Sequence, residues 1–165
     1  MTRRFTEFYQ ALADRKQISC IFEPAEQEAL VWTDHVMTAV VLDNLLSNAV
    51  KFSPAGSCVR ISLSLEQERV ACKVRDEGPG IGPEDQAKLF QRGGRLTPEP
   101  TGGESSTGYG LAVAKEFIDK LGGTIWYESR PGEGSCFAFR LARYQEQIHG
   151  PGRSEPWSSI ENAAL

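Results

Sequence analysis

The segment Asp76-Glu77-Gly78-Pro79-Gly80-Ile81-Gly82 combines a carboxylate with alternating glycines, a pattern able to bind a flat ligand. Asp76 follows an alternating apolar run, so its carboxylate would stand at the end of a strand and could accept a hydrogen bond from an amino group. Glycines at alternate positions let the backbone approach a ring closely and adopt φ values that other residues resist. An ordinary strand-to-helix turn is the alternative, although such a turn needs only one or two glycines.

A second glycine-rich segment, Thr107-Gly108-Tyr109-Gly110-Leu111, precedes a predicted helix and could bind phosphate. The N–H groups at the start of a helix lack partners within the helix and attract anions, and glycines let a phosphate come close to them. Glycine-rich helix starts also occur without any ligand. Val113 stands where a dinucleotide-binding GxGxxG motif has its third glycine, and the sequence has no Gly-Lys dipeptide for a P-loop. If this segment binds phosphate, we therefore expect its fold to differ from the dinucleotide-binding and P-loop folds.

Asn44, Asn48 and Lys51 form a polar stripe on a third element, a predicted helix from Asp34 to about Phe52. At about 100° per residue these three side chains fall within about 60° of one another, opposite the leucines of the same helix. A face turned to solvent is the simpler interpretation of such a stripe. Asparagine, however, costs about 0.5–0.7 kcal/mol relative to alanine inside a helix, and a solvated face more often carries Glu or Lys. The stripe is therefore a candidate site.

The spacing of apolar residues predicts the elements that must position these groups. It predicts helices at about 5–12, 34–52, 83–90 and 109–121, strands at 18–22 and 29–32, and hairpins at 59–74 and 124–141. This order favours an α+β fold, a two-layer α/β sandwich in which a mixed sheet is covered on one face by helices. The predicted division is an N-terminal helix over residues 1–16, a domain that carries the candidate site over 17–144, and a flexible tail over 145–165.

Length and composition restrict the class of protein. With 165 residues and a formal charge of −4, the chain suits one domain and lacks the basic surplus typical of proteins that bind nucleic acid or anionic membranes. The N-terminal residues lack the apolar core of a signal peptide, and no apolar run reaches the ~18 residues of a membrane span. We therefore expect a cytoplasmic domain with no nucleic-acid partner and no direct membrane contact.

Taken together, the motifs resemble the catalytic ATP-binding domain of two-component sensor histidine kinases, in the superfamily shared with DNA gyrase, the ninety-kilodalton heat-shock chaperone and the MutL mismatch-repair ATPases. Leu42–Phe52 resembles the asparagine box of this family, Asp76–Gly80 its first glycine box, and Gly108–Leu111 its second. Gly132–Phe137 resembles the glycine turn that precedes the last strand. The resemblance covers about Ile18 to Ala142, and it implies the Bergerat ATP-binding fold with ATP and Mg²⁺ as ligands.

The resemblance assigns the phosphate side of the site to the asparagine box. It implies that Asn48 ligates Mg²⁺ through its amide oxygen and that Asn44, one turn earlier, supports the metal or the phosphates. Lys51 would reach a phosphate, and Phe52 would lie beside the nucleotide. Asn44, Asn48 and Lys51 are thus the implied catalytic residues. A neutral amide suits this position because it offers Mg²⁺ an oxygen without repelling the triphosphate.

The adenine side and the lid follow from the two glycine boxes. The resemblance implies that Asp76 accepts the adenine amino hydrogen and that Gly78 and Gly80 make room for the ring. Residues 91–107 would form the ATP lid, in which Gly93 stands where the family usually has an aromatic residue. The remaining implied nucleotide contacts are Ile81, Arg95, Thr107, Gly108, Tyr109, Gly110 and Leu111. Among these, Tyr109 replaces a leucine that is usual in the family.

The phosphoacceptor histidine of a histidine kinase is not recognisable in this sequence. His35 is followed by Val36 at a predicted helix start, and His149 lies in the tail. The resemblance therefore implies a histidine-bearing dimerisation domain, in the same full-length protein or in another, and a downstream response regulator. Residues 1–16 are expected to be a remnant of the connection to that domain. The chain would then be cytoplasmic, either free or as the cytosolic part of a membrane-bound sensor.

Two other functions fit the same motifs. A stand-alone relative could phosphorylate serine on a protein partner, as anti-sigma-factor kinases do. A non-catalytic module could use nucleotide binding to gate an interaction. All three functions share the premise that the chain binds ATP.

Overall fold

A five-stranded mixed sheet forms one layer of the molecule in a computed structural model, which describes residues 1–94, 97–103, 107–144 and 161–165. The strand order is β1-β3-β4-β6-β5. β1 and β3 are parallel, and the other neighbours are antiparallel. Their bounds are β1 Ser19–Glu23, β3 Cys58–Glu66, β4 Arg69–Asp76, β5 Thr124–Ser129 and β6 Ser135–Ala142.

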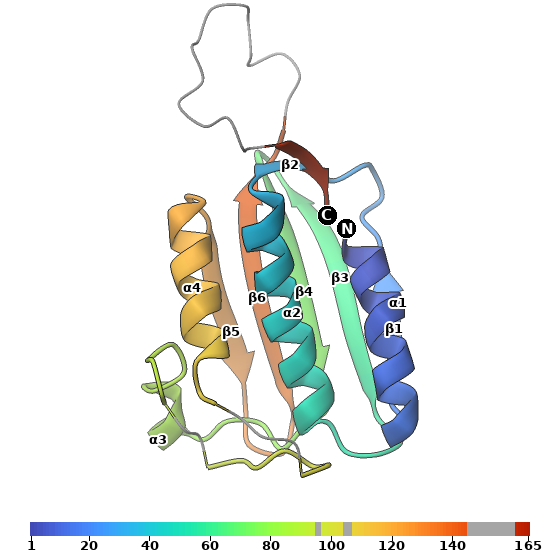
Figure 1. Cartoon of the computed structure of the whole chain (residues 1–165), viewed down its shortest axis with the longest axis vertical. Coiled ribbons are helices and arrows are strands. Elements are labelled where there is room, and N and C mark those ends of the chain that lie inside the picture. Colours follow the sequence, from blue (N-terminus) through green and yellow to red (C-terminus); the bar gives the residue numbers. More distant parts are fainter. Residues whose placement is uncertain (95–96, 104–106, 145–160) are drawn as a thin grey trace, which may run out of the picture.

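Helices cover one face of this sheet (Figure 1). They are α1 Thr2–Ala13, which continues into the 3₁₀ turn η1 Asp14–Lys16, α2 His35–Phe52 and α4 Gly110–Lys120. The two-layer α/β sandwich with a mixed sheet is therefore confirmed. No helix within the described ranges is long and apolar enough to cross a membrane.

The helix predicted over residues 83–90 is shorter than expected. Only α3, Pro83–Gln86, is α-helical. Lys88 and Gln91 donate their backbone N–H groups to Asp85 and Lys88, three residues earlier, at 2.9 and 3.0 Å. Such three-residue hydrogen bonds wind the chain more tightly than an α-helix, so the segment continues as successive turns.

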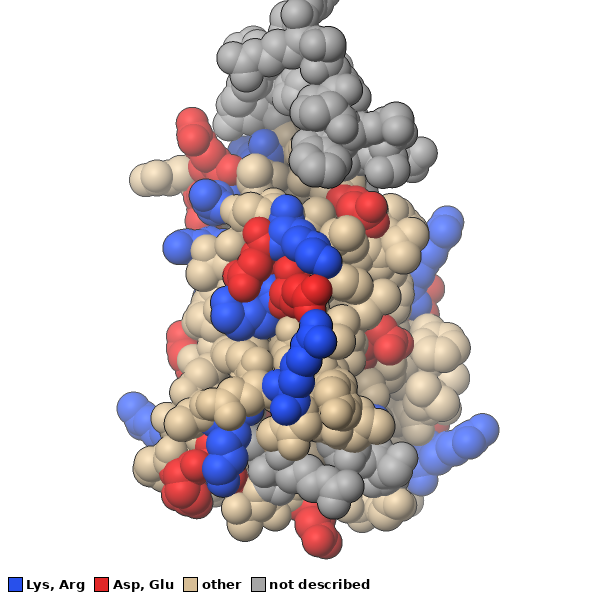
Figure 2. Space-filling view, turned by 60° about the vertical axis from the view of Figure 1, so that its left-hand side comes forward, with Lys and Arg blue, Asp and Glu red and all other residues tan. Residues whose placement is uncertain are grey.

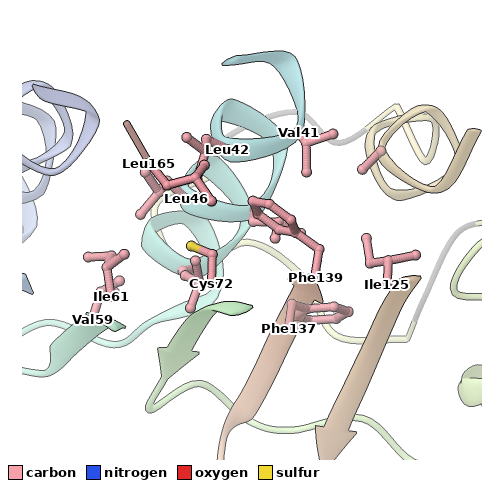
Figure 3. Packing of buried hydrophobic residues seen from close by; sticks show 14 of the residues in the cluster. Val41, Leu42, Leu46, Val59, Ile61, Cys72, Ile125, Phe137, Phe139 and Leu165 are labelled. Carbon is pink, nitrogen blue, oxygen red and sulfur yellow. The ribbon is translucent and has the colours of Figure 1, made fainter. Parts of the chain in front are cut away.

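The core lies between α2 and the sheet (Figure 3). Leu42 and Leu46 of α2 are fully buried, as are Ile61 of β3, Cys72 of β4 and Phe139 of β6. The apolar side of α2 thus packs on the sheet, and its polar stripe lies on the opposite side of the helix. Burial of each such side chain contributes roughly 1.5–3 kcal/mol.

Residues 1–16 pack into the same core and do not form a separate unit. Tyr9 and Ala13 of α1 are buried in the cluster of core residues. The Tyr9 hydroxyl donates to the Asp43 carboxylate of α2 at 2.7 Å. Phe8 and Leu12, by contrast, are 61% and 39% exposed, so only part of the predicted apolar side of this helix faces the core. The origin of the segment as a remnant of an upstream domain stays a prediction.

The last five residues are part of the fold, which corrects the prediction of a flexible tail for this end of the chain. Glu161–Ala164 form β7, which pairs antiparallel with β2, Leu30–Thr33, and Leu165 is buried beside Leu42 and Leu46 (Figures 1 and 3). The backbone N–H of Leu165 donates to the carbonyl of Ala29 at 3.3 Å. A distant segment thus supplies the hydrogen-bond partners of the β2 edge. The other residues of the predicted tail, 145–160, lie outside the described ranges.

Candidate functional site

A pocket of about 550 Å³ opens beside the second half of α2, the start of α4 and the loop after β4. Most of the residues singled out by sequence line it. These are Asn44, Asn48, Lys51, Phe52, Asp76, Gly80, Ile81, Thr107, Gly108, Gly110 and Leu111. The fold therefore brings the three sequence motifs to one cavity, although tens of residues separate them along the chain.

Of the predicted residues that the structure describes, Gly78 and Tyr109 do not line this pocket. Gly78 lies behind its wall, where a Cβ would stand 2.8 Å from Asp76 Oδ1 and 2.9 Å from the Phe52 carbonyl oxygen. Glycine at this position thus serves the packing of the loop. Tyr109 is 53% exposed outside the pocket. Its hydroxyl would lie 3.7 Å from a Cβ on Gly93, so the two positions that depart from the family pattern face each other. Arg95 lies outside the described residues.

Asp76 is the last residue of β4, and its side chain is buried, with 5% exposed. Its Oδ1 accepts hydrogen bonds from the backbone N–H groups of Gly78, at 2.8 Å, and Ser135, at 3.2 Å. Within the described residues both bonds end on Oδ1, which leaves Oδ2 for a ligand. Burial raises the pKa of this carboxyl to about 6, against the opposing effect of the two N–H donors. The group is therefore mostly ionised at neutral pH and can accept a hydrogen bond.

The loop after Asp76 rests on the turn between β5 and β6. Gly80 has φ +70°, and a Cβ there would overlap the carbonyl oxygen of Arg130. The N–H of Gly132 donates to the carbonyl of Pro79 at 2.8 Å. Backbone therefore packs directly on backbone, and this contact fixes the loop at the edge of the pocket.

The polar stripe of α2 faces the start of α4. The Asn44 amide nitrogen donates to the Val40 carbonyl at 2.9 Å, and this bond turns Asn44 Oδ1 toward Gly110. Glycine at position 110 permits this approach, because a Cβ there would overlap that oxygen unless the Asn44 side chain moved. Among the described residues, no side chain caps the start of α4. Its first N–H groups lack helical partners, so the positive end of the helix is available to an anion beside an amide oxygen.

Sequence reasoning missed several residues that line the pocket. Ser47 could have been found, because it lies about 40° from Lys51 on the same helical wheel. Ser135 and Phe137 come from β6, which pairs with β4 in a way that no local pattern indicates. Leu89 is a further such residue. Pro79 also lines the pocket but belongs to the predicted first glycine box, and Gly94, Pro98, Glu99, Pro100 and Gly103 fall within residues 91–107, which are expected to form the ATP lid.

Charges of both signs alternate on the surface that carries α4 (Figure 2). Glu116 pairs with Arg92 at 2.6 Å and with Lys120 at 3.1 Å, and Lys115 pairs with Asp119 at 2.8 Å. Ion pairs thus balance these charges of α4 and Arg92 locally.

Comparison with known proteins identifies the family. Residues 33–145 match the model of the histidine kinase-, DNA gyrase B- and HSP90-like ATPases. The chain is 39% identical over 124 residues to sensor histidine kinase WalK of Bacillus subtilis, covering 74% of this chain and 20% of WalK. It is 42% identical over 112 residues to the adaptive-response sensory kinase SasA of Prochlorococcus marinus, covering 67% of this chain and 29% of SasA. The chain thus spans less than a third of either relative.

Solved structures agree with this assignment. Full-length ShkA, crystallised in complex with AMPPNP, matches with a TM-score of 0.73 and 27% identity over 86% of this chain and 29% of ShkA. The nucleotide-free catalytic domain of histidine kinase ThkA also matches with a TM-score of 0.73, at 25% identity over 86% of this chain and 91% of that domain. The sheet and its helices therefore form the Bergerat fold, and the chain belongs to the family of histidine kinase-, DNA gyrase B- and HSP90-like ATPases.

Proposed function

We propose that this chain is the ATP-binding catalytic domain of a sensor histidine kinase. It binds Mg-ATP in the pocket and transfers the γ-phosphate to a histidine on a separate dimerisation domain, from which a response regulator receives it. The observation that carries the proposal is the convergence of the Asp76 carboxylate, the asparagine stripe of α2 and the uncapped start of α4 on one cavity.

Asp76 and the loop after it suit the adenine ring. The free Oδ2 accepts a hydrogen bond from the adenine amino group, while Oδ1 is held by the N–H groups of Gly78 and Ser135. Ile81 and Phe137 supply apolar surface to the same cavity. A buried acceptor among apolar walls favours a ligand that offers an amino group on a flat ring.

Asn44, Asn48, Lys51 and the start of α4 suit the phosphates. Mg²⁺, when bound, would neutralise phosphate charge, and the amide oxygens of Asn48 and Asn44 are the kind of ligand that it prefers. Lys51 lines the same cavity and carries a positive charge, and the N–H groups at the start of α4 add donors. Together these groups hold the γ-phosphate for in-line attack, which is the main contribution of a protein to phosphoryl transfer.

The attacking histidine comes from outside this domain. His35 is the first residue of α2, nine positions before Asn44, and at about 1.5 Å per residue it lies roughly 14 Å along the helix from the nearest lining asparagine. His149 lies outside the described residues. Residues 17–144 are thus proposed as an ATP-binding domain that works on a partner domain.

Phosphate transfer from γ-labelled ATP to a histidine-bearing dimerisation domain tests this function. We expect labelling that is lost in acid, as for phosphohistidine, and that is absent when the acceptor histidine is replaced by alanine. Acid-stable label on serine would instead favour a serine kinase. Tight ATP binding without transfer to any such domain would favour a nucleotide-gated interaction module.

A further inference from the structure

Residues 97–103, which we call the strap, form one wall of the pocket. Pro98, Glu99 and Pro100 line the cavity, and Gly103 lines it further along. Hydrogen bonds at Thr97 and Thr101 join the strap to other described parts of the domain. These bonds hold the strap, and with it this wall of the pocket, against the rest of the domain.

The first attachment is at Thr97. Its backbone N–H donates to Asp85 Oδ2 at 2.7 Å. The Asp85 side chain is buried, with 1% exposed, and its other oxygen accepts from Lys88 Nζ at 3.1 Å. This end of the strap is therefore fixed to α3 by a carboxylate that is itself held in place.

The second attachment is at Thr101, beside the end of α2. The Thr101 N–H donates to the carbonyl of Lys51 at 2.9 Å, and its hydroxyl lies 2.7 Å from the carbonyl of Ser53. Lys16 Nζ donates to the same hydroxyl at 2.6 Å. The ammonium group of Lys16 also donates to the carbonyls of Val50, at 2.8 Å, and Lys51, at 3.0 Å.

These contacts have a clear electrostatic basis. Val50 and Lys51 are among the last residues of α2, whose carbonyls lack partners within the helix. A cation is favourable at this negative end of a helix dipole. Lys16 thus satisfies the end of α2 and holds the Thr101 hydroxyl with the same ammonium group.

We propose that Lys16 and Thr101 form a latch that positions the strap against the nucleotide pocket and slows nucleotide release. Neither residue lines the cavity, so both are positioning residues that act through the strap. Lys16 belongs to η1, directly after α1, and the latch therefore ties the first helix of the domain to the pocket wall. The effect on nucleotide rests on the proposed ATP-binding function.

Two substitutions at position 101 separate the hydroxyl from the shape of the side chain. Thr101→Val keeps the shape and the backbone N–H but removes the hydroxyl, whereas Thr101→Ser keeps the hydroxyl. We expect Thr101→Val to release a fluorescent N-methylanthraniloyl ATP roughly 2- to 10-fold faster than the parent in stopped flow, and Thr101→Ser to release it at close to the parent rate. Lys16→Met should speed release as well. In the double variant, the fold-increase in release rate should be smaller than the product of the two single fold-increases.

Hydrogen exchange without nucleotide tests the latch separately from ATP binding. Peptides that contain residue 101 should exchange faster in Thr101→Val and Lys16→Met than in the parent. Thr124→Val, an exposed threonine on β5, is the matched control and should change neither readout. Melting temperatures identify any variant that fails to fold, and the Val and Ser pair remains informative if Lys16→Met is unstable.

The outcomes distinguish the two claims. Equal release and equal exchange for Thr101→Val, Thr101→Ser and the parent would overturn the latch while leaving ATP binding intact. A parent that does not bind the fluorescent ATP would overturn the proposed function and the role of the latch in release together. Exchange would then show only whether the hydrogen bonds hold the strap in the free protein.

Discussion

Replacing Asp76 by asparagine should weaken ATP binding through a specific mismatch of donors. Oδ1 of Asp76 accepts from the N–H groups of Gly78 and Ser135, so the asparagine must keep its oxygen on that side to preserve the loop. Its amide nitrogen then takes the place of Oδ2 and faces the adenine amino group. Two donors meet, and neither finds an acceptor. The opposite rotamer would satisfy adenine but oppose the two backbone N–H groups with a third donor.

The size of the effect follows from the burial of the group. A hydrogen bond to a charged partner contributes about 1.5–3 kcal/mol, and a donor left unpaired in a buried site costs a similar amount. Asp76 is only 5% exposed, so water cannot replace the lost acceptor well. The dissociation constant for ATP should therefore rise by roughly 10- to 150-fold.

Isothermal titration calorimetry of ATP against the parent and Asp76→Asn measures this directly. Asp119→Asn is the matched control, because it removes a carboxylate that pairs with Lys115 on the surface of α4. Melting temperatures verify that each variant is folded. A folded Asp76→Asn variant with the parent's affinity would refute the assignment of Asp76 to the adenine site.

Four further outcomes test other parts of the site and the fold. Lowering the pH from 7 to 5 should weaken ATP binding about tenfold, because protonation through a pKa of about 6 leaves about one-tenth of Asp76 ionised, and this component should vanish from the same titration of Asp76→Asn. Asn48→Ala should remove most of the Mg²⁺ dependence of ATP binding in calorimetry, and an unchanged dependence would contradict the metal assignment. Gly80→Ala should lower the free energy of unfolding by at least about 1 kcal/mol in urea titrations, because φ is +70° and a Cβ meets the Arg130 carbonyl; a variant as stable as the parent would contradict the packing of this loop. Tyr9→Phe should lower the same free energy by about 1–2 kcal/mol through loss of the bond to Asp43, and equal stability would show that this bond contributes little.

Elements with local signals in the sequence were predicted closely. The helix expected from Asp34 begins at His35, and Asp34 Oδ1 accepts the N–H of Met37 at 2.9 Å as an N-cap should. The alternation of apolar residues correctly indicated the hairpin of β3 and β4. The polar stripe of α2 was also recognisable, since helical periodicity alone sets which side chains share a face. The same stripe lines the pocket in the structure.

Features that depend on distant pairing could not be predicted. β7 pairs with β2 although Asn162, Ala163 and Ala164 have low strand propensity, because the open edge of β2 supplies the hydrogen bonds. The contact of Lys16 with Thr101 joins residues 85 positions apart. No local pattern encodes either pairing, since each depends on how the sheet and α2 place the backbone in space.

The central claim is that the cavity between α2, α4 and the loop after β4 is a Mg-ATP site. Calorimetric titration of ATP into the parent chain, with Mg²⁺ present and with Mg²⁺ removed by a chelator, tests it most directly. We expect saturable binding of one ATP per chain that is markedly tighter with Mg²⁺. Absence of binding under both conditions would contradict it.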